Sequence, residues 1–293
     1  MKAAISGETL GSVMELDEIL SLFQKNGIHF IEIWPENIPV KVGKTLLHKR
    51  LYANRDVEQA KKILEKYQIK AACVCFGAGF DKELAKDPEL FSRELERAVE
   101  IAYELGAKVV NHYCYHVAMG PEISFSELEK YYGRAIRKAK HRKIYLALEN
   151  EAHDITQSPE GMKTIVEHMN SEYFKTNFDA TNYYQAGYEG FPYAYEVLKE
   201  YIVHVHIKNG CFYHPEFGHE KQCRGGKMTG MFAGNDIYYP YASDGAVNID
   251  GLLRRLENGY TGFCTMEPHT TPEKCLDFYR EETAYLRERG IKE

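Results

Sequence analysis

Residues 144–179 read IYLALENEAHDITQSPEGMKTIVEHMNSEYFKTNFD. This stretch opens and closes with short apolar runs, IYLALE and FKTNFD, and each run has the length of a strand and ends in a carboxylate. Parallel strands need a crossover connection of a dozen or more residues, usually helical, and the intervening segment is long enough to supply one. The stretch therefore predicts one strand–helix–strand unit with parallel strands.

The same alternation runs along the whole chain. Eight apolar runs predict strands at Lys2–Ser6, His29–Trp34, Ala71–Phe76, Lys108–Tyr113, Ile144–Glu149, Phe174–Asp179, Ile202–Ile207 and Phe263–Glu267. Helical spacing between them is clearest at Ser92–Leu105, Ser126–Lys140 and Pro272–Arg289. Helix stop signals at Asn26-Gly27, Gly106 and Asn258-Gly259 each precede a strand. Eight such units favour a single-domain (β/α)8 TIM barrel over residues 1–293, with a doubly wound sheet as the alternative.

One unit is longer than the others. From His206 to Glu267 the chain takes about twice the roughly 30 residues that one barrel unit needs. The excess, residues 209–244, is rich in glycine and aromatic residues and shows no helical period. Loops of this length are usually functional or disordered. The aromatic content favours an ordered lid or a contact surface.

Composition excludes several classes of protein. The 293 residues include 37 basic and 43 acidic side chains, a net charge of −6, and are 44% hydrophobic. This balance argues against a general nucleic-acid or anionic-membrane partner. No apolar run approaches the ~20 residues of a membrane helix, and the first residues turn acidic too early for a secretory signal. Seven cysteines without a C-x-x-C pair fit a reduced, cytoplasmic protein.

Polar residues end four successive predicted strands. Glu149, Asp179, His206 and Glu267 each close an apolar run, and strand alternation lets all four point into the barrel. Active sites of such barrels lie at these carboxyl ends. Three converging carboxylates would repel one another unless a cation joins them, and this donor set suits Mn²⁺, Mg²⁺ or Co²⁺. Any one of these residues alone would be interpreted as a buried, hydrogen-bonded residue at a strand end. The set of four predicts a divalent-metal site.

Other residues near the strand ends are candidates with two interpretations each. His112 is a candidate general base or a hydrogen-bonded strand-end histidine, and Glu32 is a candidate substrate contact or a structural ion pair. Trp34, the single tryptophan, could stack on a sugar face. Lys208 could hold an anionic oxygen or be solvated. His204, also a candidate substrate contact, lies one layer below His206 and is expected to support it rather than bind the metal.

The stretches ALENE, NFDATN, HVHIKN and TMEPH, in this order, resemble the xylose isomerase-like TIM-barrel superfamily of sugar (phosphate) isomerases and epimerases. The segment from Ser243 to Pro268 is similar to the last β-α unit of that family. The resemblance implies a divalent metal, Mn²⁺ foremost with Zn²⁺ also among the options, on Glu149, Asp179, His206 and Glu267. It further implies that Glu149 and Glu267 act as acid and base on a carbohydrate substrate, removing a proton next to a carbonyl.

Three positions depart from the ketose 3-epimerases of this family. Those enzymes carry a glutamate, a histidine and an arginine where this chain has Ile155, Asn182 and Phe212. Asn182 stays a candidate substrate contact, but a standard free-ketose epimerase is not the only expectation. The alternative is a lyase of the same superfamily that acts on oxidised (3-oxo) glycosides, such as a C- or O-deglycosidase, or a dehydratase. Endonuclease IV shares the barrel, but its additional zinc-binding histidines are absent.

Two expectations concern partners. A homo-oligomer is expected. The chain could also be the catalytic subunit of a hetero-oligomer whose small partner covers the aromatic insert, because tyrosines at such a surface suit a protein interface as well as a substrate.

Overall fold

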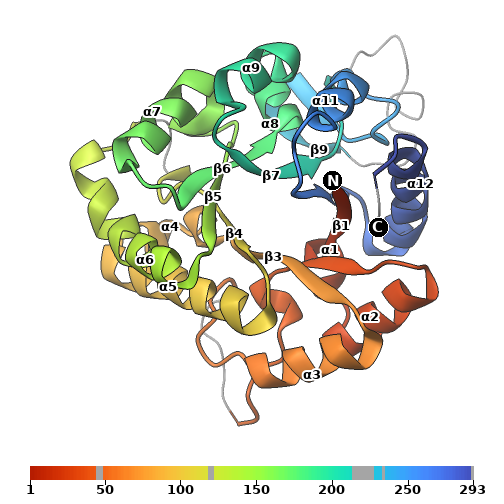
Figure 1. Ribbon diagram of the computed structural model, residues 1–293, viewed down its shortest axis with the longest axis horizontal. Coiled ribbons are helices and arrows are strands. Elements are labelled where there is room, and N and C mark those ends of the chain that lie inside the picture. The colour runs from red at the N-terminus through yellow and green to blue at the C-terminus, as the bar shows by residue number, and fades with distance from the viewer. Residues whose placement is uncertain (44–48, 118–121, 213–227, 233–234, 292–293) are drawn as a thin grey trace.

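A computed structural model of the chain describes residues 1–43, 49–117, 122–212, 228–232 and 235–291. Eight parallel strands close into a barrel, confirming the predicted fold (Figure 1). In chain order they are β1 (Lys2–Ser6), β2 (Phe30–Ile33), β3 (Lys70–Phe76), β4 (Val109–His112), β5 (Tyr145–Glu149), β6 (Phe174–Asp179), β7 (Ile202–Ile207) and β11 (Phe263–Met266). Every strand lies within one residue of its predicted bounds, the usual uncertainty at element ends.

Helices follow the strands and surround the barrel (Figure 1). They are α1 (Glu8–Gly11), α2 (Leu16–Lys25), α3 (Val57–Tyr67), α4 (Lys82–Ala85), α5 (Pro88–Leu105), α6 (Leu128–Arg142), α7 (Pro159–Met169), α8 (Ala180–Gln185), α9 (Tyr195–Leu198), α11 (Ile249–Leu256) and α12 (Cys275–Glu288). Helix α5 begins four residues before its predicted start because Asp87 caps it and Pro88 fits its first position. It ends as predicted at Gly106, whose φ of 80° is left-handed.

Strand alternation sorts side chains into two layers. Outward-facing residues such as Leu148, Phe178 and Val205 are fully buried in the apolar core against the helices. Inward-facing residues at the carboxyl ends of β5, β6 and β7 are polar, and Cys73, Val109 and Ala147 form a small buried apolar cluster further down. Strands β6 and β7 show a register shift at which Val203 is an extra residue, so that Asn177 stays opposite His204. Asp179 and His206, the polar ends of β6 and β7, are therefore register partners.

The insert after β7 contains a small antiparallel sheet rather than a helix. Its strands are β8 (Cys211–Phe212), β9 (Met228–Phe232) and β10 (Asn235–Tyr238), in the order β8-β10-β9. The Asn209 side chain donates hydrogen bonds to the carbonyls of Ala242 (2.7 Å) and Val247 (3.0 Å), which joins the start of the insert to its end. Residues 213–227 and 233–234 lie outside the described residues, so the predicted lid is described only in part. In the described parts of the chain, no helix combines the length and the apolar character that crossing a bilayer requires.

Candidate active site

The four predicted metal ligands converge at the carboxyl ends of their strands. Glu149 at the end of β5, Asp179 at the end of β6, His206 on β7 and Glu267 after β11 each offer one ligand atom, and these atoms all lie within 4.8 Å of one another. All four side chains are buried, with at most 5% of the residue exposed. We call these residues the carboxylate–histidine cluster. The structure thus brings together the four residues that the strand ends singled out.

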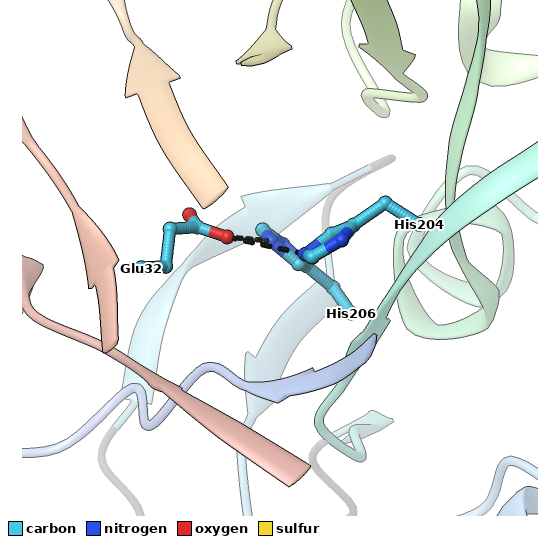
Figure 2. A group of neighbouring side chains, drawn as sticks. All are labelled: Glu32, His204 and His206. Carbon is cyan, nitrogen blue, oxygen red and sulfur yellow. Dashed lines mark hydrogen bonds and ion pairs between the residues drawn. The ribbon is translucent and has the colours of Figure 1, made fainter. Parts of the chain in front are cut away.

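His206 is held on both of its ring nitrogens. Nε2 lies 2.9 Å from Oε2 of Glu32, and Nδ1 lies 3.0 Å from Oε1 of Glu149 and 3.7 Å from Oε2 of Glu267. Figure 2 shows Glu32 reaching across the barrel from β2 toward His204 and His206. Burial alone would lower the pKa of His206, but the surrounding carboxylates of Glu149, Glu32 and Glu267 outweigh it and hold that pKa well above its usual range. The contact with Glu32 leaves Nδ1 facing the cluster.

Lys208 places a positive charge against two of the ligands. Its Nζ lies 2.8 Å from Oδ2 of Asp179 and 2.5 Å from Oε2 of Glu267, and the residue is only 4% exposed. Burial raises the pKa of a carboxyl group, but Lys208 and then His206 outweigh it and hold the pKa of Glu267 well below its usual range. The burial of Lys208 excludes the prediction that this lysine is solvated. Lys208 is a buried cation that partly offsets the charge of the cluster.

Glu149 has a different environment from Glu267. Its Oε2 accepts hydrogen bonds from the side-chain amides of Asn111 (2.7 Å) and Asn177 (3.2 Å). Burial raises its pKa and the nearby Glu267 carboxylate adds to that effect, while His206 opposes both. The two candidate acid–base residues are therefore shifted in opposite directions, a pattern typical of paired catalytic carboxylates.

The structure does not bring His112 to the cluster, which corrects its prediction as a base. Inward-facing Asn111 precedes it on β4, so His112 faces outward and pairs in register with Leu148. Its ring packs 5.4 Å from those of Tyr132 and Phe174. Burial lowers its pKa to about 3. His112 is a core residue that stays neutral.

Glu32 and His204, predicted as substrate contacts, lie beneath the cluster and are fully buried. His204 Nε2 is 2.9 Å from Oγ1 of Thr265 and 3.4 Å from Oε2 of Glu32. This matches the expectation that His204 supports His206, and it assigns Glu32 to the ion-pair interpretation. Neither side chain reaches a surface that a substrate could touch in this arrangement.

Trp34 and Asn182 both donate their side-chain N–H groups to partners within the protein. Trp34 Nε1 donates to Oγ of Ser6 (2.9 Å), and the residue is 1% exposed. The Asn182 side chain donates to the carbonyl of Asn150 (2.8 Å), and its backbone N–H donates to Oδ1 of Asp179 (3.0 Å). Asn182 therefore fixes Asp179 and the loop after β5, and the amide nitrogen that a predicted substrate contact could use is engaged there.

Besides Asn111, the sequence analysis missed two residues next to Glu267. His269 Nε2 lies 3.3 Å from Oε2 of Glu267, and Tyr239 of the insert stacks on the His269 ring with centroids 4.3 Å apart and planes at 22°. His269 was within reach of prediction, because it follows the strand-end glutamate by two residues in TMEPH. Tyr239 was not, because nothing in a loop sequence shows which of its tyrosines folds back onto the barrel.

The cluster fits a divalent cation. Three carboxylates and one imidazole nitrogen are the donor set that hard and borderline divalent ions prefer. A histidine whose other nitrogen meets a carboxylate is the usual support for a metal-binding imidazole. Lys208 and the imidazole of His206, whose pKa is raised, offset part of the negative charge of the three carboxylates, and a divalent cation would replace the His206 proton and relieve the remaining repulsion.

The comparisons with known proteins agree with the barrel fold. The family model described as xylose isomerase-like TIM barrel matches residues 20–289. A search of curated proteins returns no significant match. Solved structures give many matches, and the three described next are 15–17% identical to this chain.

Three of these structures cover nearly the whole chain. The probable 3-DHS dehydratase AsbF from Bacillus anthracis has a TM-score of 0.69 and 17% identity, covering 98% of this chain and 99% of its own. The IolI protein with a bound zinc atom has a TM-score of 0.67 and 17% identity, covering 98% of each chain. A D-allulose 3-epimerase from Methylomonas sp. has a TM-score of 0.67 and 15% identity, covering 99% of this chain and 97% of its own. With the family model over residues 20–289, this chain belongs to the xylose isomerase-like TIM-barrel family.

Proposed function

We propose that this protein is a divalent-metal-dependent isomerase or epimerase that acts on a sugar or sugar derivative by removing a proton next to a carbonyl. The observation that carries the proposal is the convergence of Glu149, Asp179, His206 and Glu267 within 4.8 Å at the catalytic end of the barrel. The epimerase and the zinc-bound protein among the similar structures support it by analogy of fold.

The cluster residues would hold the cation, with Mn²⁺ as the first expectation. When bound, such an ion supplies positive charge that polarises a carbonyl or hydroxyl oxygen of the substrate. Glu149, whose pKa is raised by burial, has the proton affinity that a general base needs. Glu267, held against Lys208 and His269, is the second carboxylate and can return or receive a proton on the other side of the reacting carbon.

A lyase or dehydratase is the second candidate, and one observation favours it. At two positions where ketose 3-epimerases contact their substrate, the side chains of this chain make other contacts. Asn182 is bonded to the Asn150 carbonyl, and Phe212 packs on Tyr184 with ring centroids 4.8 Å apart as part of the insert sheet. Elimination from a 3-oxo glycoside begins with the same proton removal, so the cluster serves both reactions. The probable dehydratase among the similar structures carries the same implication by analogy.

The test combines metal content with solvent-deuterium incorporation. We expect about one equivalent of Mn, Mg, Co or Zn per purified chain, by mass spectrometry, and deuterium entering a free ketose. Glu149→Gln and Glu267→Gln should each stop the exchange while the circular dichroism spectrum stays unchanged, because an amide cannot take up the proton. Glu58→Gln, at an exposed helical position paired with Lys62, is the matched control.

The outcomes separate the candidates. Exchange or aglycone release with 3-oxo glycosides, without exchange in free ketoses, would select the lyase. Exchange that persists in both glutamine variants would refute the mechanism. A chain that takes up no divalent metal, even when metal is supplied in excess, would refute the assignment of the cluster.

A further inference from the structure

The end of the barrel opposite the cluster contains a cavity. It has a volume of about 850 Å³ and lies where the strands begin, lined by Lys2 at the start of β1 and Phe263 at the start of β11, among others. Inside the barrel, Cys73, Val109 and Ala147 are buried and pack together between this cavity and the polar strand ends. The cavity is therefore separate from the candidate active site and is not a second entrance to it.

Aromatic side chains form much of its wall. Phe30, Tyr145, Tyr260 and Phe263 line it, and all four are half-buried. The rings of Phe30 and Phe263 lie 4.9 Å apart, and the Tyr260 hydroxyl donates to the carbonyl of Phe263 at 2.7 Å. The planes of Phe30 and Phe263 are tilted by 59°, so the wall offers separate ring faces against which a flat apolar ligand can pack.

The charge of the wall has one sign. Lys2, Lys70 and Lys108 line the cavity, and no aspartate or glutamate does, although acidic residues outnumber basic ones in the chain. Among the described residues, none of these three lysines forms an ion pair with an acidic side chain. The Lys2 ammonium lies 5.5 Å from the Phe30 ring centroid and 5.7 Å from that of Phe263. Its positive charge is thus placed at the edge of the aromatic wall.

We propose that this cavity binds a small organic anion with a flat apolar body, such as an aromatic carboxylate or an aryl phosphate. Its volume is in the range of small-molecule sites, roughly 300–1,000 Å³. Paired aromatic faces supply apolar contact area, and three uncompensated lysines attract an acidic group. The site is independent of the metal chemistry proposed above, because the buried layer at Cys73 separates the two.

The test is a calorimetric titration of the full chain with 1-naphthoate at low ionic strength, beside the neutral analogue 1-naphthylmethanol. We expect one naphthoate per chain and at least tenfold weaker binding of the alcohol. The variant with Lys2→Gln, Lys70→Gln and Lys108→Gln should bind naphthoate at least tenfold more weakly. A control with Lys25→Gln, Lys61→Gln and Lys140→Gln, three exposed lysines elsewhere, makes the same change in net charge and should bind as the unmodified chain does.

Other outcomes would overturn the proposal. Equal binding of the acid and the alcohol would remove the role of charge, and unchanged binding in the cavity-lysine variant would place the ligand elsewhere. Val203→Trp, which fills the cavity from its wall, should abolish binding of both probes, and retained binding would likewise refute the location. If the chain dimerises and the cavity-lysine variant does not, by analytical ultracentrifugation, the face is a contact between two copies and the small-molecule proposal fails.

Discussion

Oε2 of Glu32 lies 2.9 Å from Nε2 of His206, and this contact joins β2 to β7 across the interior of the barrel. Both side chains are fully buried. A carboxylate on the far nitrogen of an imidazole fixes the ring and raises its basicity, which is how proteins commonly prepare a histidine for a metal. The contact therefore gives Glu32 a positioning role that its own place on the second strand does not reveal.

Replacing Glu32 by glutamine should weaken metal binding while the barrel stays folded. The amide keeps the size of the side chain but loses the negative charge, and losses of supporting contacts of this kind usually lower metal affinity roughly 10- to 100-fold. Calorimetric titration with Mn²⁺ measures the effect. Glu58→Gln is the control, because its pair with Lys62 is exposed and surface pairs contribute little. Equal Mn²⁺ affinity in the Glu32 variant and the unmodified chain would contradict the role.

The sequence predicted the barrel and the four ligands because both depend on local patterns. A carboxylate or histidine that ends an apolar run falls at the carboxyl edge of a parallel sheet, and Glu149, Asp179, His206 and Glu267 do so in four successive units. The same reasoning failed in VVNH at the end of β4, where two polar residues are adjacent. Alternation allows only one of them inside, and the Asn111 contact with Glu149 shows which one it is.

Contacts across the barrel could not be predicted. Glu32 meets His206 only because the closed barrel brings β2 opposite β7, and Lys208 turns inward because Asp179 and Glu267 flank it from two other strands. Such pairings depend on closure and side-chain conformation rather than on spacing along the chain. The sequence indicated which residues were candidates, and the tertiary structure decided their roles.

Lys208→Met should destabilise the protein strongly in the absence of metal. The change leaves the Asp179 and Glu267 carboxylates buried without their cation, and losing one partner of a buried ion pair costs about 3–5 kcal/mol. Added Mn²⁺ should restore much of that loss, because it supplies the missing positive charge. Thermal unfolding in EDTA and in Mn²⁺ measures both effects. An equal fall in Tm under the two conditions would show that Lys208 contributes packing rather than charge.

His112 should make the protein less stable in acid. Its imidazole is fully buried, Nε2 has no hydrogen-bond partner among the described residues, and burial lowers its pKa from 6.5 to about 3. The unfolded chain therefore takes up a proton below about pH 6.5 that the folded chain refuses until about pH 3, so stability falls as the pH is lowered through that window. From pH 7.5 to pH 5 the loss due to this group is about 2 kcal/mol.

Urea unfolding of the unmodified chain and of His112→Leu at several pH values tests this expectation. The variant is expected to lose less stability on acidification, because leucine packs against Tyr132 and Phe174 without a titrating group. The informative quantity is the difference between the two slopes, since the substitution also changes packing at every pH. Parallel curves between pH 7.5 and pH 5 would argue against a neutral, desolvated His112.

Tyr239 should connect the insert to the candidate active site through its ring rather than its hydroxyl group. The ring stacks on His269 at 4.3 Å, and His269 contacts Glu267, whereas the hydroxyl donates to Oε1 of Gln185 at 3.0 Å. Tyr239→Leu should shift the His269 imidazole proton resonances downfield as the ring current is lost, and Tyr239→Phe should leave them nearly unchanged. Similar resonances in the leucine variant would show that the stacking does not persist in solution, and a shift in the phenylalanine variant would assign the coupling to the Gln185 hydrogen bond.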